Sequence, residues 1–136
     1  MKKIMNDIAA FKAAHDRALP DKLEIPDAKR TELLAKLIRE EFRETMLAIY
    51  PFWDTSKEAS PIAVDPVALA DGLTDLVYVA VGMALECGLP LDKVWDEVHS
   101  SNMRKIGPDG NFVTREDGKI LKPAGWVGPD IEGCLK

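Results

Sequence analysis

The stretch Arg39-Glu40-Glu41-Phe42-Arg43-Glu44 places three glutamates inside a segment that otherwise has the apolar pattern of a buried helix. On a helix of 3.6 residues per turn, Glu41 lies about 20° from Leu34, and Glu44 lies about 20° from Leu37. Two carboxylates therefore interrupt the apolar stripe that should face the protein core. Carboxylates rarely enter a core without a partner, so this stretch needs a positive group beside it.

A second acidic stretch, Asp71-Gly72-Leu73-Thr74-Asp75, lies in a segment that is apolar in nearly every other direction. Asp71 and Asp75 are four residues apart, so they stack on one helical face and repel each other. Glu86 falls roughly on the same face and is a more distant candidate. We expect a positive group between the two acidic helices, and a hard divalent cation is the simplest one.

Apolar periodicity predicts four helices, and hence an all-α class, with prolines marking several helix ends. The predicted helices cover residues 2–17, 27–50, 65–86 and 91–105. The third helix begins with Asp65 as N-cap and Pro66 at its first position, and it stops at Gly88. Its apolar residues cover more than half of its circumference, so it needs neighbours on several sides, as in a bundle core or a dimer interface.

The connecting and C-terminal segments have a different character. Residues 51–64 hold two prolines and indicate a surface loop, with Phe52 and Trp53 anchoring it or lining a pocket. After residue 106, two short runs flank Asp117-Gly118, which predicts a β-hairpin. The tail from Pro123 is rich in glycine and proline, and we expect it to be irregular.

Length and composition indicate a single domain over residues 1–136, of which about 107–136 form the hairpin and tail. The net charge is −5 and the lysines and arginines are scattered, which argues against nucleic acid as a partner. The longest apolar run, residues 76–85, is too short to span a bilayer, so no membrane association is expected. Two cysteines without zinc or disulfide spacing, and a polar N-terminus, favour a cytoplasmic location.

The acidic residues form an all-oxygen donor set, which Mg²⁺ or Mn²⁺ prefers. With only His15 and His99 in the chain, imidazole-rich zinc or iron sites are poorly supported. Carboxylate-bound Mg²⁺ suits chemistry on phosphate, because it screens phosphate charge and activates a water molecule. The predicted metal ligands are Glu41, Glu44, Asp71 and Asp75. The predicted base is Glu40, and the predicted substrate-binding residues are Asn102, Lys105 and Arg39.

Each of these signals also has a plainer interpretation. A Glu-Glu-x-x-Glu run is often only a solvated helix face, and the two aspartates could instead form ion pairs with Arg39 or Arg43. Asn102 and Lys105 continue the inner stripe of the fourth helix, but they could equally mark its exposed, frayed end. On the residues alone, these alternatives stay open.

The run Glu40-Glu41-x-x-Glu44, followed by Asp71-Gly-Leu-Thr-Asp75-Leu-Val-Tyr, resembles the paired acidic motifs of the MazG-like all-α nucleoside triphosphate pyrophosphohydrolases. That superfamily also contains phosphoribosyl-ATP pyrophosphohydrolase and the all-α dUTPases. The resemblance extends through Val98-His-Ser-Ser-Asn-Met-Arg-Lys105 and covers about residues 28–130.

The resemblance implies a four-helix bundle core that forms a homodimer or a dimer of dimers and requires Mg²⁺. It also implies cleavage between the α- and β-phosphates of a (deoxy)nucleoside triphosphate, which yields a monophosphate and pyrophosphate. Glu41 and Glu44 match the family's metal-binding glutamates, and Glu40 matches the leading acid that can act as base. Asp75 matches the last residue of the usual Glu-x-x-Asp motif, but Gly72 stands where that motif has its glutamate.

The leading hypothesis is therefore a Mg²⁺-dependent pyrophosphohydrolase with a house-cleaning role on a non-canonical or excess nucleotide. Asp71, one residue before Gly72, would then replace the missing glutamate. The alternative is a non-catalytic dimeric helical module that binds a nucleotide or has a regulatory role, and the missing glutamate favours it. A structural bundle whose acids are salt-bridged is a third and weaker hypothesis.

Overall fold

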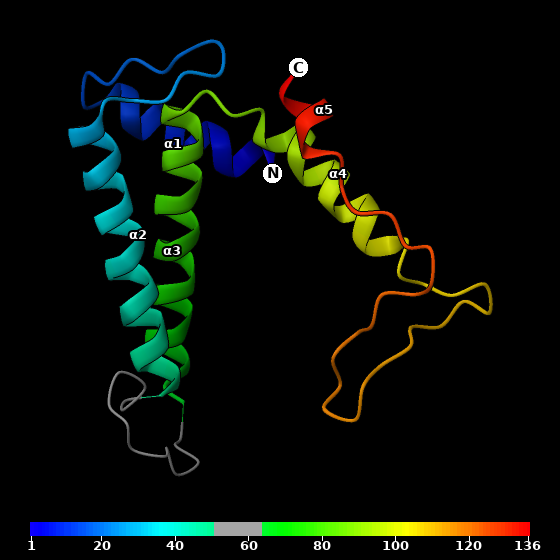
Figure 1. Cartoon of the computed structure of the whole chain (residues 1–136). Helices are drawn as coiled ribbons and strands as arrows, with labels where there is room; N and C mark the ends of the chain where they lie inside the picture. Colours follow the sequence, from blue (N-terminus) through cyan, green and yellow to red (C-terminus); the bar gives the residue numbers. More distant parts are fainter. Residues whose placement is uncertain (51–63) are drawn as a thin grey trace. The chain divides into compact units, whose positions relative to one another are not determined.

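The computed structural model describes residues 1–50 and 64–136, and these form two compact units (Figure 1). The N-terminal unit, Lys2–Leu89, contains three helices: α1 (Lys2–Ala13), α2 (Ala28–Ile49) and α3 (Pro66–Glu86). The C-terminal unit, Pro90–Lys136, contains α4 (Leu91–Met103) and α5 (Ile131–Leu135). The described chain is all-α, as the sequence predicts. Most of the predicted 51–64 loop, with Phe52 and Trp53, lies outside the described residues.

Local capping explains where α2 and α3 begin. The Asp27 carboxylate accepts a hydrogen bond from the Arg30 backbone N–H at 2.8 Å, and the Asp65 carboxylate accepts one from the Val67 N–H at 2.8 Å. After α3, Gly88 has φ +61°, and a Cβ there would lie only 2.1 Å from the Lys22 carbonyl oxygen. Glycine is required at this turn, because any side chain would collide with the backbone of the α1–α2 connection.

Helix α1 is shorter than the predicted range of 2–17. It ends at Ala13, and Asp16 then adopts φ 52°, which is the left-handed conformation. The Arg17 N–H bonds back to the Lys12 carbonyl at 3.1 Å, which closes the turn. The chain therefore leaves the helix several residues before Pro20.

Helices α2 and α3 run side by side in opposite directions, and α1 lies across the end at which α2 begins and α3 ends (Figure 1). The two long helices come close together at Gly72. A Cβ placed on Gly72 would lie 3.0 Å from the Thr45 hydroxyl oxygen and 3.1 Å from the Thr45 Cα. Thr45 is buried, and its hydroxyl donates to the Glu41 carbonyl at 2.8 Å. A side chain at residue 72 would force the Thr45 backbone and residue 72 apart by a few tenths of an ångström.

Glu86 joins all three helices of the N-terminal unit. This buried carboxylate on α3 accepts a hydrogen bond from the Lys12 ammonium of α1 at 2.5 Å. The Arg30 guanidinium of α2 donates two more hydrogen bonds to it, each at 2.6 Å. Glu86 is therefore a structural residue, and it is not the distant site participant that its helical face suggested. The two acceptor oxygens are both used, which a buried carboxylate requires.

In the C-terminal unit, α4 packs against α5, and the intervening segment folds back along α4. The Trp126 indole N–H donates to the Ser101 carbonyl at 2.9 Å. The predicted β-hairpin is not confirmed, because the described segment forms two isolated antiparallel bridges, Ile106↔Phe112 and Thr114↔Ile120, and no strand. Helix α5 was not predicted in the tail. Its start is capped by Asp130, whose carboxylate accepts from the Gly133 N–H at 2.8 Å.

The predicted four-helix bundle is not confirmed either, because α4 belongs to the C-terminal unit. Within the described residues, α3 is the single helix that is long and apolar enough to cross a membrane by length and composition. This is weak evidence, since core helices of soluble proteins pass the same test. The uninterrupted apolar run 76–85 is shorter than α3 because it begins after Asp75, whereas α3 also contains Asp71 and Asp75.

The Glu86 network predicts a specific acid sensitivity of the N-terminal unit. Burial alone would raise the pKa of Glu86, but hydrogen bonds from Arg30 and Lys12 outweigh it and lower the pKa to about 2. A lowered pKa stabilises the fold at any pH above the ordinary value and loses this contribution as pH falls through about 2. We expect Glu86→Gln to lower the free energy of unfolding at pH 7 by about 3 kcal/mol, measured by urea denaturation.

The matched control is Glu32→Gln, which removes an exposed carboxylate paired with Lys36 at 2.7 Å on the same unit. Its effect should stay within about 0.5 kcal/mol. The difference between wild type and Glu86→Gln should shrink as pH falls from about 4.5 toward 2. A difference that does not change over this range would contradict the assignment.

The Gly72 contact predicts opposite outcomes for two glycine substitutions in α3. Glycine to alanine inside a helix ordinarily gains about 1 kcal/mol. At Gly72 the new methyl group meets the Thr45 backbone, and overpacking of this kind costs about 1–3 kcal/mol, so Gly72→Ala should lower the free energy of unfolding. Gly82→Ala meets only the flexible end of Lys12, at 3.3 Å, and should be neutral or stabilising. Equal stabilisation by both substitutions would rule out a tight helix contact at residue 72.

Candidate functional site

The acidic residues predicted to form a metal site lie on either side of the close contact between α2 and α3. Glu41 is half-buried on α2, one turn before Thr45, and Glu40 and Glu44 are exposed next to it. On α3, Asp71 and Asp75 flank Gly72 and are exposed. Gly72 touches Thr45, and the acids on each helix lie only a few residues from this contact. The acids of α2 are therefore near those of α3.

The pKa of Glu41 responds to the charges of acids on both helices. Burial raises the pKa of Glu41, and the negative charges of four neighbours raise it further. In order of decreasing effect, these neighbours are Glu44, Asp75, Glu40 and Asp71. The acids of α3 therefore act directly on an acid of α2, and like charges are held together at the surface of the helix pair.

These five carboxylates have no cationic partner within residues 1–50 and 64–136. The side-chain ion pairs of the N-terminal unit involve other acids: Asp7, Glu32 and Glu86. The alternative in which Asp71 and Asp75 are held in ion pairs by arginines is thus not found in the described part of the chain. The acids carry an uncompensated negative charge, which attracts a cation.

The chemistry of this donor set fits Mg²⁺ or Mn²⁺, since all the available donors are oxygens. The described residues nevertheless contain no group of three or more histidine, cysteine, aspartate or glutamate side chains that converges as a metal site. The ligand set is therefore not preassembled. A hard cation that keeps several of its own water molecules suits such an open arrangement of carboxylates.

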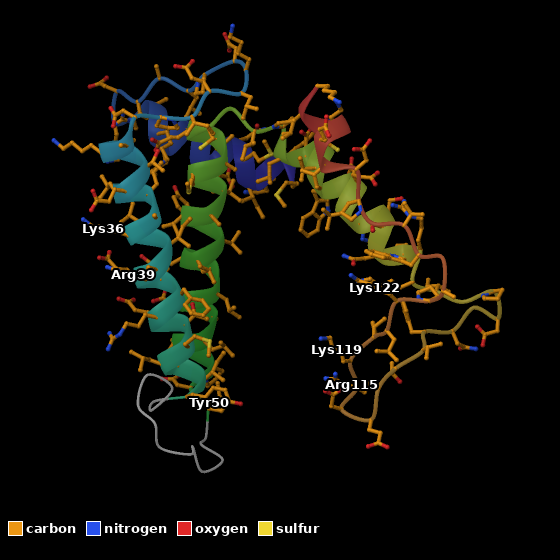
Figure 2. All side chains as sticks on the ribbon, in the orientation of Figure 1. Lys36, Arg39, Tyr50, Arg115, Lys119 and Lys122 are labelled. Atoms are coloured by element: carbon orange, nitrogen blue, oxygen red, sulfur yellow. The ribbon has the colours of Figure 1, made fainter. Side chains whose placement is uncertain are left out.

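Arg39, predicted to bind substrate, lies on a different face of α2. Figure 2 shows Arg39 and Lys36 projecting from the side of α2 that is turned away from α3. Both residues line an open cavity of about 280 Å³ together with Glu32 and Ala35. Arg39 thus belongs to the outer surface of α2 and not to the surface that the five acids share.

Asn102 and Lys105 lie at the end of α4, where they contact each other. The Lys105 ammonium donates a hydrogen bond to the Asn102 side-chain oxygen at 2.7 Å. The same ammonium is 5.6 Å from the centre of the Trp126 ring, and the Lys122 ammonium is 4.5 Å from it. Trp126 and Lys122 were not predicted as site residues. A lysine and a tryptophan in an apparently irregular tail give no periodic signal, so sequence reasoning missed this cluster.

Comparison with known families agrees with the geometry. The model of the phosphoribosyl-ATP pyrophosphohydrolase family matches residues 9–102, most of the chain. The matched region contains the whole of α2 and α3, and therefore all five acids, and it ends at Asn102. A comparison with individual curated proteins gives no match. The length of the family match shows that the chain belongs to the phosphoribosyl-ATP pyrophosphohydrolase family, within the MazG-like superfamily.

Proposed function

We propose that this protein is a Mg²⁺-dependent pyrophosphohydrolase that cleaves the α–β phosphoanhydride of a nucleoside or deoxynucleoside triphosphate. Family membership supports the reaction class, hydrolysis of an acid anhydride. The observation that carries the metal dependence is the group of five carboxylates on α2 and α3, which have no cationic partner in the described chain. Burial raises the pKa of one of them, Glu41, and the negative charges of the other four raise it further. A triphosphate is itself anionic, so these carboxylates would repel it without a bound cation.

In this proposal Glu41, Glu44, Asp71 and Asp75 hold the cation. Bound Mg²⁺, or Mn²⁺ in its place, would neutralise phosphate charge and lower the pKa of a coordinated water. Glu40 is exposed and is not among the four proposed metal ligands, so it is assigned as the base that accepts the proton of the attacking water.

Asn102 and Lys105 remain assigned to the substrate, whereas Arg39, on the outer surface of α2, is not part of this proposal. A lysine ammonium provides a point charge for phosphate, and an asparagine amide can donate to and accept from a base or sugar edge. The hydrogen bond between Asn102 and Lys105 holds the two groups together, so a nucleotide would meet both. The proposed substrate class is a nucleotide, and the proposed role is cytoplasmic house-cleaning of a non-canonical or excess nucleotide.

The proposal includes a homodimer, or a dimer of dimers, formed through α3. Apolar side chains on α3 remain exposed in the single chain: Leu73 is 47% exposed and Val77 is 44% exposed. A monomeric protein seldom leaves such a helix face uncovered. Two antiparallel α2–α3 pairs, one from each copy, would then together supply the four helices of a bundle core.

The reaction is tested by measuring pyrophosphate release from a panel of nucleoside and deoxynucleoside triphosphates with Mg²⁺ or Mn²⁺, and with EDTA. Activity should require the metal. Glu41→Gln should lower kcat/KM at least about 100-fold, because it removes a charged oxygen ligand. Mg²⁺ should also raise the Tm of wild type but not of Glu41→Gln, because a metal bound by the folded state stabilises it.

Glu32→Gln is the matched control, since it removes one negative charge from α2 at an exposed position away from the acidic group. It should keep wild-type activity. Nucleotide binding without turnover on any member of the panel would support the alternative, a non-catalytic nucleotide-binding module. Turnover that survives in Glu41→Gln would contradict the proposed site.

The dimer is tested with Val77→Asp, which places a charge on the exposed apolar face of α3. We expect sedimentation velocity to show a dimer or larger assembly for wild type and a monomer for Val77→Asp. The matched control is Val113→Asp, an equally drastic change at an exposed valine of the C-terminal unit. It should leave the assembly unchanged, and a monomeric wild type would contradict the interface.

A further inference from the structure

The N-terminal unit contains a charged hollow that the proposed reaction does not use. It lies beside the first two turns of α2, has a volume of about 530 Å³, and is lined mainly by charged side chains. The lining charges are Arg17, Lys29, Arg30, Lys36, Asp27 and Glu32. Lys29, Glu32 and Lys36 recur at helical spacing, so they project from one face of α2, and Figure 2 shows Lys36 on its outer side.

The acids of this hollow are already engaged. The Asp27 carboxylate caps α2 by accepting the Arg30 N–H, and Glu32 is paired with Lys36 at 2.7 Å. The Arg30 guanidinium is likewise committed to Glu86. Arg17 and Lys29 are left over, because neither side chain has an ion-pair or hydrogen-bond partner within residues 1–50 and 64–136. Two unmatched positive charges therefore border a cavity in a chain of net charge −5.

Arg17 also connects this hollow to its surroundings. It also lines two further cavities, of about 310 and 270 Å³. The residue owes this position to the turn after α1, in which the Arg17 N–H bonds to the Lys12 carbonyl. The main cavity is larger than an inorganic anion needs and falls within the size range of small-molecule sites, roughly 300–1,000 Å³.

We infer that this hollow binds a phosphate monoester of about the size of a sugar phosphate, with its phosphate group between Arg17 and Lys29. A phosphate monoester carries nearly two negative charges at pH 7, which matches the two unmatched cations. The arginine fork and the lysine point charge are complementary ligands for phosphate oxygens. The remaining volume accommodates the organic part of the ligand, next to Leu33.

This site is separate from the acidic group. Arg30 and Glu41 are 11 residues apart on α2, which corresponds to about 16 Å along the helix axis. Binding in the hollow requires neither Mg²⁺ nor any of the five carboxylates. The inference therefore goes beyond the proposed reaction, and it would hold even if the protein hydrolysed no nucleotide.

Isothermal titration calorimetry in EDTA tests the site, because removal of divalent metal excludes metal-dependent binding at the acidic group. The probes are glucose 6-phosphate, inorganic phosphate, glucuronate and glucose. We expect glucose 6-phosphate to bind most tightly and glucose not to bind. The double variant Arg17→Ala/Lys29→Ala should weaken the binding of glucose 6-phosphate at least tenfold. Both side chains are exposed, so the variant should keep the wild-type circular dichroism spectrum.

The matched control is Lys2→Ala/Lys119→Ala, which removes the same charge from exposed positions outside the hollow. It should bind glucose 6-phosphate as wild type does. No binding of glucose 6-phosphate to wild type, or equal weakening in both double variants, would overturn the inference. Equal affinity for inorganic phosphate would overturn the assignment of an ester, and equal affinity for glucuronate would overturn the assignment of phosphate.

Discussion

The close contact between Gly72 on α3 and Thr45 on α2 is the constraint on which the candidate site depends. Backbone atoms of the two helices meet there without an intervening side chain, since a Cβ on residue 72 would lie 3.1 Å from the Thr45 Cα. Helices that approach this closely bring the residues next to the contact within range of each other's charge. The raised pKa of Glu41, to which Asp71 and Asp75 both contribute, is the measurable consequence.

Glu86 joins the helices at the other end of the α2–α3 pair. Its carboxylate binds Lys12 and Arg30 with both oxygens, so α1, α2 and α3 are joined through one buried ionic network. The acids at the two ends of α3 therefore differ in their partners. Near α1 the acid is paired with protein cations, whereas Asp71 and Asp75 have no cationic partner within residues 1–50 and 64–136. A structural acid and candidate functional acids are thus distinguished by their partners and not by their helical face.

Several features were predictable from the sequence because they depend on local chemistry. The bounds of α2 and α3 agree with the prediction to within a residue, since Asp27 and Asp65 cap them. The position of Ala13 as the end of α1 was not predictable, because it depends on the left-handed conformation of Asp16. Helix α5 has only five residues, too few for periodicity to be visible.

The candidate site, too, was predictable from the sequence only in part. The placement of acids on neighbouring faces of two helices follows from helical spacing, but which of them bind metal stays a prediction, because ligation depends on side-chain positions that spacing does not determine. Gly72 was interpreted from sequence as a missing ligand. In the structure, the absence of a side chain at residue 72 lets Thr45 of α2 pack against α3. A sequence motif does not show such a contact between two helices. The pairing of Glu86 with Lys12, 74 residues away, was equally hidden.

Helix α2 has a charge order that opposes its own macrodipole. Its first turn contains Lys29 and Arg30 and no acid besides the capping Asp27, and its last turn contains no base. Glu40, Glu41 and Glu44 precede that last turn, together with Arg39 and Arg43. Helices ordinarily favour the reverse order, by about 0.3–1 kcal/mol for each well-placed charge. An anion bound at the beginning of α2 and a cation bound near its end would each interact favourably with the macrodipole, so occupancy of either proposed site would stabilise this helix.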